Sequence, residues 1–149
     1  MSDHPVGSSA DLHRLALFLA RRTGDADYAQ VLALDAVRWA QGQTQEGRNV
    51  PFGSLLAASL RPAEETIRAR DIAVATEQSM AGVIAALGPV EREVLRLVYW
   101  DHVSMGELAD FFDCTMSRAG ALLDRAYRSA ERRATRLGNI PASYSREPD

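Results

Sequence analysis

Apolar residues recur every three or four positions along most of this chain, and this spacing constrains its fold more than any other feature. Such a period places apolar side chains on one face of a helix, whereas a half-buried strand needs strict alternation, of which there is no useful length. Ala and Leu, which favour helix, are abundant. The pattern therefore predicts an all-α fold with helices over residues 10–22, 25–41, 52–60, 62–87, from 89 onward, 104–112 and 116–137.

Proline, glycine and capping residues set the expected boundaries of these helices. Pro62 fits the first turn of the helix over 62–87, which Gly88 and Pro89 end, and Ser104 is a residue type that caps helix N-termini. Residues 41–51 have no apolar period and predict a loop. We expect two small helical lobes joined by a helical linker: a flexible arm at 1–9, a lobe at 10–60, the linker at 61–88, a helix-turn-helix lobe at 89–137 and a disordered tail at 138–149.

The composition argues against several classes of protein. No apolar run approaches the ~18 residues of a membrane span, and residues 1–10 lack the layout of a secretory signal, so we expect a cytoplasmic protein without membrane contact. Cys114 is the only cysteine, so no internal disulfide or cysteine-based zinc site can form. We expect a small buried hydrophobe there, with a redox-sensing thiol as the alternative. His4, His13 and His102 lack metal-ligand spacing and no phosphate loop occurs, which predicts no enzyme, no metal and no cofactor.

Charge is distributed unevenly, although the whole chain has a net charge of only −3. Residues 116–136 hold six arginines against two acidic residues, a net charge of +4. Residues 90–113 hold two arginines against six acidic residues, a net charge of −4. Since the overall charge gives no attraction to nucleic acid, affinity for DNA must come from the basic segment.

The basic segment is the second of two helices separated by a turn at 113–115. This arrangement is typical of a helix-turn-helix, in which the first helix braces the second and the second enters the major groove. At about 100° per residue, one side of the second helix is expected to pack on the bracing helix and carries Ala119, Leu123, Ala126 and Ala130. The neighbouring side, with acidic Asp124 and Glu131 away from it, carries Arg118, Leu122, Arg125, Ser129, Arg132 and Arg136. An ordinary solvated helix face is the alternative to a DNA-binding one.

The residues expected to contact DNA lie at the start and on the exposed side of this helix: Thr115, Ser117, Arg118, Ala121, Leu122, Arg125 and Arg128. Thr115 and Ser117 can cap the helix, contact phosphate, or do both. The core of this lobe is expected to consist of Leu108, Phe112 and Leu123. We expect the two tryptophans to be core or inter-lobe anchors rather than base-stacking platforms: Trp39 and Trp100.

Motifs over residues 86–134 point to a known family. Pro89 precedes the run 92–95 (Arg-Glu-Val-Leu), Ser104 precedes 107–109 (Glu-Leu-Ala) in the bracing helix, and Arg125 and Ala126 follow in the second helix. At this spacing the segment resembles the fourth conserved region of the extracytoplasmic-function sigma factors of bacteria. The resemblance implies recognition of a −35-type promoter element in double-stranded DNA, with RNA polymerase core as a partner and an anti-sigma factor as a further one.

Residues 12–41 resemble the start of that family's second region, which docks on RNA polymerase. The helix over 25–41 is similar to the polymerase-contacting helix, although Leu34 and Val37 stand where a glutamine and an aromatic residue are usual. The resemblance implies polymerase contact by Asp35, Arg38 and Trp39, with Asp35 at the family's acidic position.

The promoter-opening segment of the family, rich in aromatic and basic residues, is abbreviated in this chain. Residues 41–60 offer only Phe52 and Arg48 for trapping unstacked bases. Gly120 and Leu122 also stand where the family often has Lys and Arg. We therefore expect binding to duplex DNA but poor promoter opening without a second factor. The alternatives are a sigma mimic or adaptor that binds an anti-sigma factor or other protein through the same fold, and a stand-alone helix-turn-helix regulator.

Overall fold

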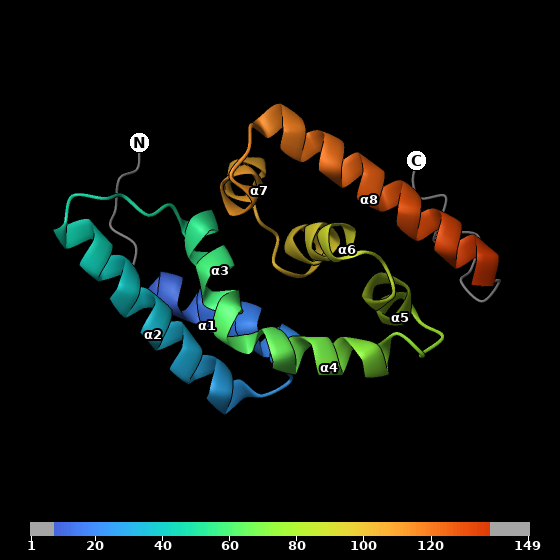
Figure 1. Cartoon of the computed structure of the whole chain (residues 1–149), viewed down its shortest axis with the longest axis horizontal. Helices are drawn as coiled ribbons and strands as arrows, with labels where there is room; N and C mark the ends of the chain where they lie inside the picture. The colour runs from blue at the N-terminus through green and yellow to red at the C-terminus, as the bar shows by residue number, and fades with distance from the viewer. Residues whose placement is uncertain (1–7, 138–149) are drawn as a thin grey trace.

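The computed structural model describes residues 8–137, and every regular element within that range is helical (Figure 1). The all-α prediction is confirmed. The expected tail at 138–149 and all but the last two residues of the expected arm at 1–9 lie outside the described residues. In chain order the elements are α1 (Ser9–Thr23), α2 (Ala26–Gln45), α3 (Phe52–Leu60), η1 (Arg61–Ala63), α4 (Glu64–Val74), α5 (Met80–Ala85), α6 (Pro89–Leu95), the π-helical turn η2 (Arg96–Trp100), α7 (Met105–Phe112) and α8 (Met116–Leu137).

Side-chain caps explain where most of these helices begin. The hydroxyl of Ser8 accepts a hydrogen bond from the backbone N–H of Asp11 at the start of α1, and the carboxylate of Asp25 does the same for Tyr28 in α2. Ser104 and Glu107 form a reciprocal capping box at the start of α7, which confirms Ser104 as the cap. Such bonds satisfy backbone donors that a helix leaves without intrahelical partners.

The predicted helix over 62–87 is wrong, because the chain breaks between α4 and α5. The side chain of Ser79 accepts the backbone N–H of Gly82 and starts a new helix. A Cβ added to Gly82 would lie 2.0 Å from the carbonyl oxygen of Glu77, so only glycine permits this corner. The apolar residues over 62–87 masked these local signals.

The loop predicted over 41–51 is shorter than expected. α2 continues to Gln45, where the hydroxyl of Thr44 donates to the carbonyl oxygen of Ala40. The turn follows at Gly47, whose φ of 83° lies in the left-handed region that glycine adopts without strain. Glutamines are good helix formers, so the absence of an apolar period did not end the helix.

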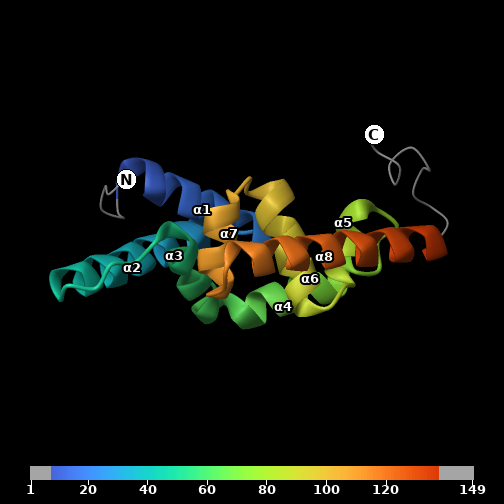
Figure 2. The same cartoon turned by 90° about the horizontal axis from the view of Figure 1, so that it is seen from above.

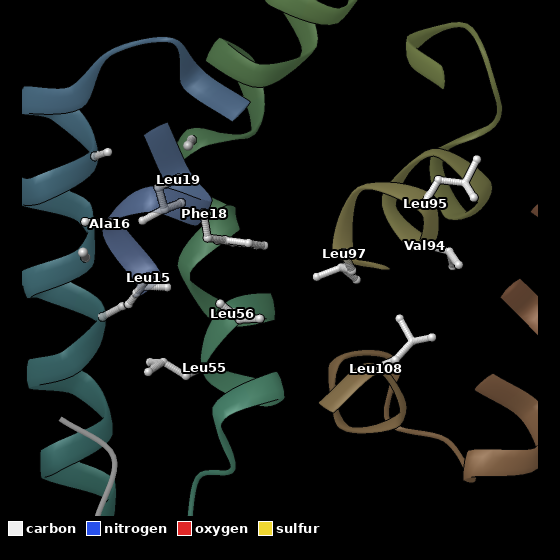
Figure 3. Packing of buried hydrophobic residues seen from close by; sticks show 14 of the residues in the cluster. Leu15, Ala16, Phe18, Leu19, Leu55, Leu56, Val94, Leu95, Leu97 and Leu108 are labelled. Carbon is white, nitrogen blue, oxygen red and sulfur yellow. The ribbon is translucent and has the colours of Figure 1, made fainter. Parts of the chain in front are cut away.

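One hydrophobic core connects the two halves of the chain. Leu15, Phe18 and Leu19 of α1 pack with α2 and α3, while α6, η2 and α7 contribute their own buried leucines and valine (Figure 3). α3 lies directly on α7, where a Cβ on Gly53 would stand 2.2 Å from the carbonyl oxygen of Glu107. The N-terminal helices therefore contact the C-terminal ones directly, besides being joined to them through α4 and α5.

The expected core residues differ in their burial. Leu108 is fully buried, whereas Phe112 and Leu123 are half-buried against the core. Trp39 is 45% exposed on the outer side of α2, so the prediction that it is a core or inter-lobe anchor is wrong. Trp100 is half-buried and lies between the two halves, where its ring contacts the guanidinium groups of Arg22 and Arg96.

Substituting Gly53 tests the close approach of α3 to α7. Gly53→Ala is expected to lower the free energy of unfolding by about 1–3 kcal/mol, because the new methyl group overlaps the α7 backbone. Gly42→Ala is the matched control: nothing lies within 4 Å of its Cβ in α2. Its better helix propensity should raise stability by about 0.5–1 kcal/mol. Urea unfolding measures both changes, and stabilisation by both substitutions would contradict the packing of α3 on α7.

Candidate nucleic-acid interface

A row of alanines holds α8 against the rest of the molecule. Ala119, Ala126, Ala130 and Ala134 are buried where α8 lies along α6 and α7 (Figures 1 and 2). The prediction that Ala119, Ala126 and Ala130 face the core is confirmed. Because small side chains occupy this side, the long side chains of α8 project from the other sides of the helix.

The turn before α8 has a defined geometry. Asp113 ends α7 in the left-handed conformation, with φ of 54°, and the N–H of Cys114 donates to the carbonyl oxygen of Ala109 at 2.9 Å. The hydroxyl of Thr115 then accepts the N–H of Arg118 at 3.0 Å, so Thr115 caps α8. Cys114, expected to be a small buried hydrophobe, is half-buried and packs against the core.

Most of the residues predicted to contact DNA are exposed at the start or on the outer side of α8. Leu122 is the exception, because it is half-buried and packs against the core, which limits its contact with a ligand. The exposed members of the predicted set are Thr115, Ser117, Arg118, Ala121, Arg125 and Arg128. Arg132 and Arg136 are exposed further along the same helix.

The arginines of α8 differ in how far the protein already neutralises them. Arg128 pairs with Asp124 at 2.9 Å, and both side chains are largely exposed. Asp124 was expected to lie away from the arginines of α8, but it contacts one of them. Arg132 donates to the hydroxyl of Ser129. Within residues 8–137, the guanidinium groups of Arg118, Arg125 and Arg136 form no ion pair with the protein. These three groups keep their hydrogen-bond donors available for an anion.

The bracing helix α7 is anchored by one carboxylate, that of Glu107. Arg14 of α1 donates two hydrogen bonds to it, at 2.6 and 2.8 Å, and the backbone N–H of Ser104 donates a third at 3.0 Å. The guanidinium of Arg14 lowers the pKa of Glu107, an effect that partial burial opposes and the bond from Ser104 reinforces. Glu107 therefore stays ionised to a lower pH than an ordinary glutamate.

The predicted polymerase-contacting residues share the outer side of α2. Asp35, Arg38 and Trp39 are exposed there, with a weak ion pair of 3.9 Å between Asp35 and Arg38. Val31 and Leu34 are exposed beside them. α2 and α8 lie towards opposite ends of the molecule (Figures 1 and 2), so these residues form a second surface, separate from the arginines of α8.

Sequence reasoning missed a cluster of buried arginines. Arg22 lies near the C-terminal end of α1, where its side chain is fully buried and pairs with Glu93 at 2.6 Å and Asp101 at 2.8 Å. Arg96 is buried too and pairs with Asp71 at 2.7 Å. Position 22 lies on the same helix face as the buried residues 15, 18 and 19. This spacing is the sequence signal that could have predicted the burial of Arg22.

A groove of about 510 Å³ opens between α1, α4 and η2 beside these arginines. Arg21, Arg22 and Arg96 line it and pair with carboxylates of the protein, whereas Arg70 also lines it and forms no ion pair within residues 8–137. Across the described residues no cluster of three or more metal-ligating side chains occurs. None of the helices within 8–137 combines the length and apolarity needed to cross a bilayer.

Comparison with protein-family models, curated proteins and solved structures gave no significant match. The resemblance to sigma factors therefore depends on the residues and spacing of the chain itself.

The lowered pKa of Glu107 predicts how stability changes with pH. A carboxylate whose folded pKa is lowered stabilises the fold above the unfolded value of about 4.3, and this contribution disappears as the pH falls through the folded pKa. Glu107→Gln should therefore lose less stability than the parent protein between about pH 5 and pH 3. Urea unfolding across this range measures the difference. Glu46→Gln, at an exposed carboxylate after α2, is the control and should follow the parent; an unchanged profile for Glu107→Gln would contradict the assignment.

Proposed function

We propose that this chain is a sigma-factor-like DNA-binding protein that acts in transcription initiation in the cytoplasm. One observation carries the proposal: Arg118 and Arg125 are exposed and unpaired on one side of a long helix, in a chain that is acidic overall. A guanidinium donates two parallel hydrogen bonds to a guanine edge or a phosphate. Free donors on such a helix fit the deep, acceptor-rich major groove of duplex DNA.

The spacing along α8 supports this use. Arg125 follows Arg118 by seven positions, about 10.5 Å along the helix, which places the two residues two turns apart on nearly the same side. In helix-turn-helix proteins the N-terminal turns of the second helix reach the base edges. We therefore assign base contacts to Arg118 and Arg125, and phosphate contacts to Thr115, Ser117 and Arg128.

The outer side of α2 is proposed to contact RNA polymerase core through Asp35, Arg38 and Trp39. Exposed apolar side chains beside a charged pair are typical of protein interfaces. The same surface supports the second candidate function, a mimic or adaptor that binds an anti-sigma factor or other protein. Binding to DNA separates the two candidates, because an adaptor of this kind does not require it.

Removing single arginines from α8 tests the DNA surface. Arg118→Ala and Arg125→Ala should each weaken binding to a preferred duplex by about 1–3 kcal/mol if they contact bases. Loss of a phosphate contact would instead weaken binding to all sequences and flatten the salt dependence. Fluorescence anisotropy with duplexes selected from a random library measures both effects. Arg68→Ala, at an exposed arginine of α4, is the control. Unchanged affinity in both single variants and the double variant would remove α8 as the DNA-binding helix.

Promoter opening is expected to be poor when the chain acts alone with polymerase core. Single-strand trapping needs accessible aromatic platforms, and the guanidinium of Arg14 already covers the half-buried ring of Phe52 at 4.4 Å. In vitro transcription on host promoters, with permanganate footprinting of unpaired thymines, measures opening. A well-characterised sigma factor with the same core enzyme is the positive control. Efficient opening by this chain without a further factor would contradict the prediction.

A further inference from the structure

We propose that Arg14 is a positioning residue for DNA binding: through the carboxylate of Glu107 it holds α7, and with α7 the turn that sets the orientation of α8. The DNA part of this inference rests on the proposed function. The mechanical part, that Arg14 holds the turn before α8, can be tested without DNA.

Arg14 lies at a junction of three helices. It belongs to α1, it donates two hydrogen bonds to Glu107 of α7, and its guanidinium lies 4.4 Å from the ring centre of Phe52 in α3. A bidentate pair fixes direction as well as distance, because both donors of the planar group must align with both oxygens. Arg14 therefore restrains the orientation of α7 relative to the N-terminal helices.

Glu107 links this pair to the start of α7. Its Oε1 accepts from both Arg14 and the backbone N–H of Ser104, while the N–H of Glu107 donates to the hydroxyl of Ser104. The ion pair and the capping box thus share one carboxylate. α7 has only eight residues, about two turns, so a disturbed first turn affects half of the helix.

The other end of α7 passes any displacement on to α8. The N–H of Cys114 donates to the carbonyl oxygen of Ala109, and the cap of α8 at Thr115 follows directly. α7 also packs along α8. A tilt of α7 therefore moves the turn and the first residues of α8, where Arg118 is located. Arg14 itself is on α1 and does not belong to the exposed arginines of α8.

Cys114 provides a native probe of the turn. It is the only cysteine of the chain and is half-buried, so the rate of its reaction with a thiol reagent reports local opening between α7 and α8. Arg14→Ala and Glu107→Gln are both expected to accelerate this reaction by about two- to thirtyfold, the range of coupling effects along packed networks. Because both substitutions break the same contact, the double variant should react about as fast as the single variants.

The same variants are then tested for binding to duplex DNA. Arg14→Ala and Glu107→Gln should lower affinity by about two- to thirtyfold, again without additivity in the double variant. Arg14→Lys keeps the charge but not the bidentate geometry, so it should restore affinity only in part. Val37→Ala, a core truncation in α2, is the control for lost stability at a distance from α7. It should change neither the rate at Cys114 nor the affinity for DNA.

Three outcomes would overturn the inference: unchanged thiol reactivity in the Arg14 and Glu107 variants, additive effects in the double variant, or equal effects from Val37→Ala. If the parent protein binds no duplex, the proposed function fails, and thiol reactivity still decides whether Arg14 holds the turn. If the parent binds DNA and the Arg14 variants bind equally well, the positioning role fails while the proposed function stands.

Discussion

The arrangement of the helices depends on the burial of one guanidinium, that of Arg22, between two carboxylates. Removing an arginine from water costs several kcal/mol unless its donors are satisfied. Here the carboxylates of Glu93 and Asp101 form ion pairs with the guanidinium of Arg22. The guanidinium also donates a hydrogen bond to the carbonyl oxygen of Phe18 at 3.1 Å and lies 3.9 Å from the centre of the Phe18 ring. Burial alone would lower the pKa of Arg22, but the two carboxylates outweigh it and keep the group charged. Apolar packing is not directional, so this cluster supplies the directional contact that fixes α1 against α6 and the end of η2.

Fixing α6 also fixes the basic surface, because α8 lies along α6 through its alanine row. Arg22 pairs with Glu93 of α6, and Arg14 pairs with Glu107 of α7. Two arginines of α1 therefore restrain the two helices on which α8 packs. The arginines of α1 and η2 differ from those of α8 in their partners. Those of α1 and η2 pair with carboxylates inside the protein, while Arg118, Arg125 and Arg136 on α8 have no ion partner within 8–137. Arg61, Arg68 and Arg70 are also exposed and form no ion pair within residues 8–137, so what distinguishes the proposed DNA surface is the spacing of Arg118 and Arg125 on one side of a long helix.

Local signals predicted most of the helices and the exposed side of α8. Ser104, the turn at 113–115 and the row of Ala119, Ala126 and Ala130 depend on neighbours within a few residues, so periodicity and capping rules located them. The break between α4 and α5 was missed for two reasons. The apolar residues continue through it, and the need for glycine at position 82 arises from a close contact with the backbone of Glu77 that the sequence pattern does not show. The partners of Arg22 lie 71 and more residues away, and no local pattern could name them. For the same reason Arg14 did not enter the predicted site.

The direct contact between α3 and α7 has a consequence for the proposed role in transcription. Two lobes on a free linker could adjust their separation to two distant partners, but here Gly53 meets the α7 backbone and the core continues through the contact. The outer side of α2 and the arginines of α8 are thus parts of one body (Figure 1). Separating them would expose the leucines between α3 and α7 and leave Glu93 and Asp101 without their buried cation, a cost of several kcal/mol. A polymerase bound to α2 must therefore present duplex DNA at the place and angle that α8 already defines.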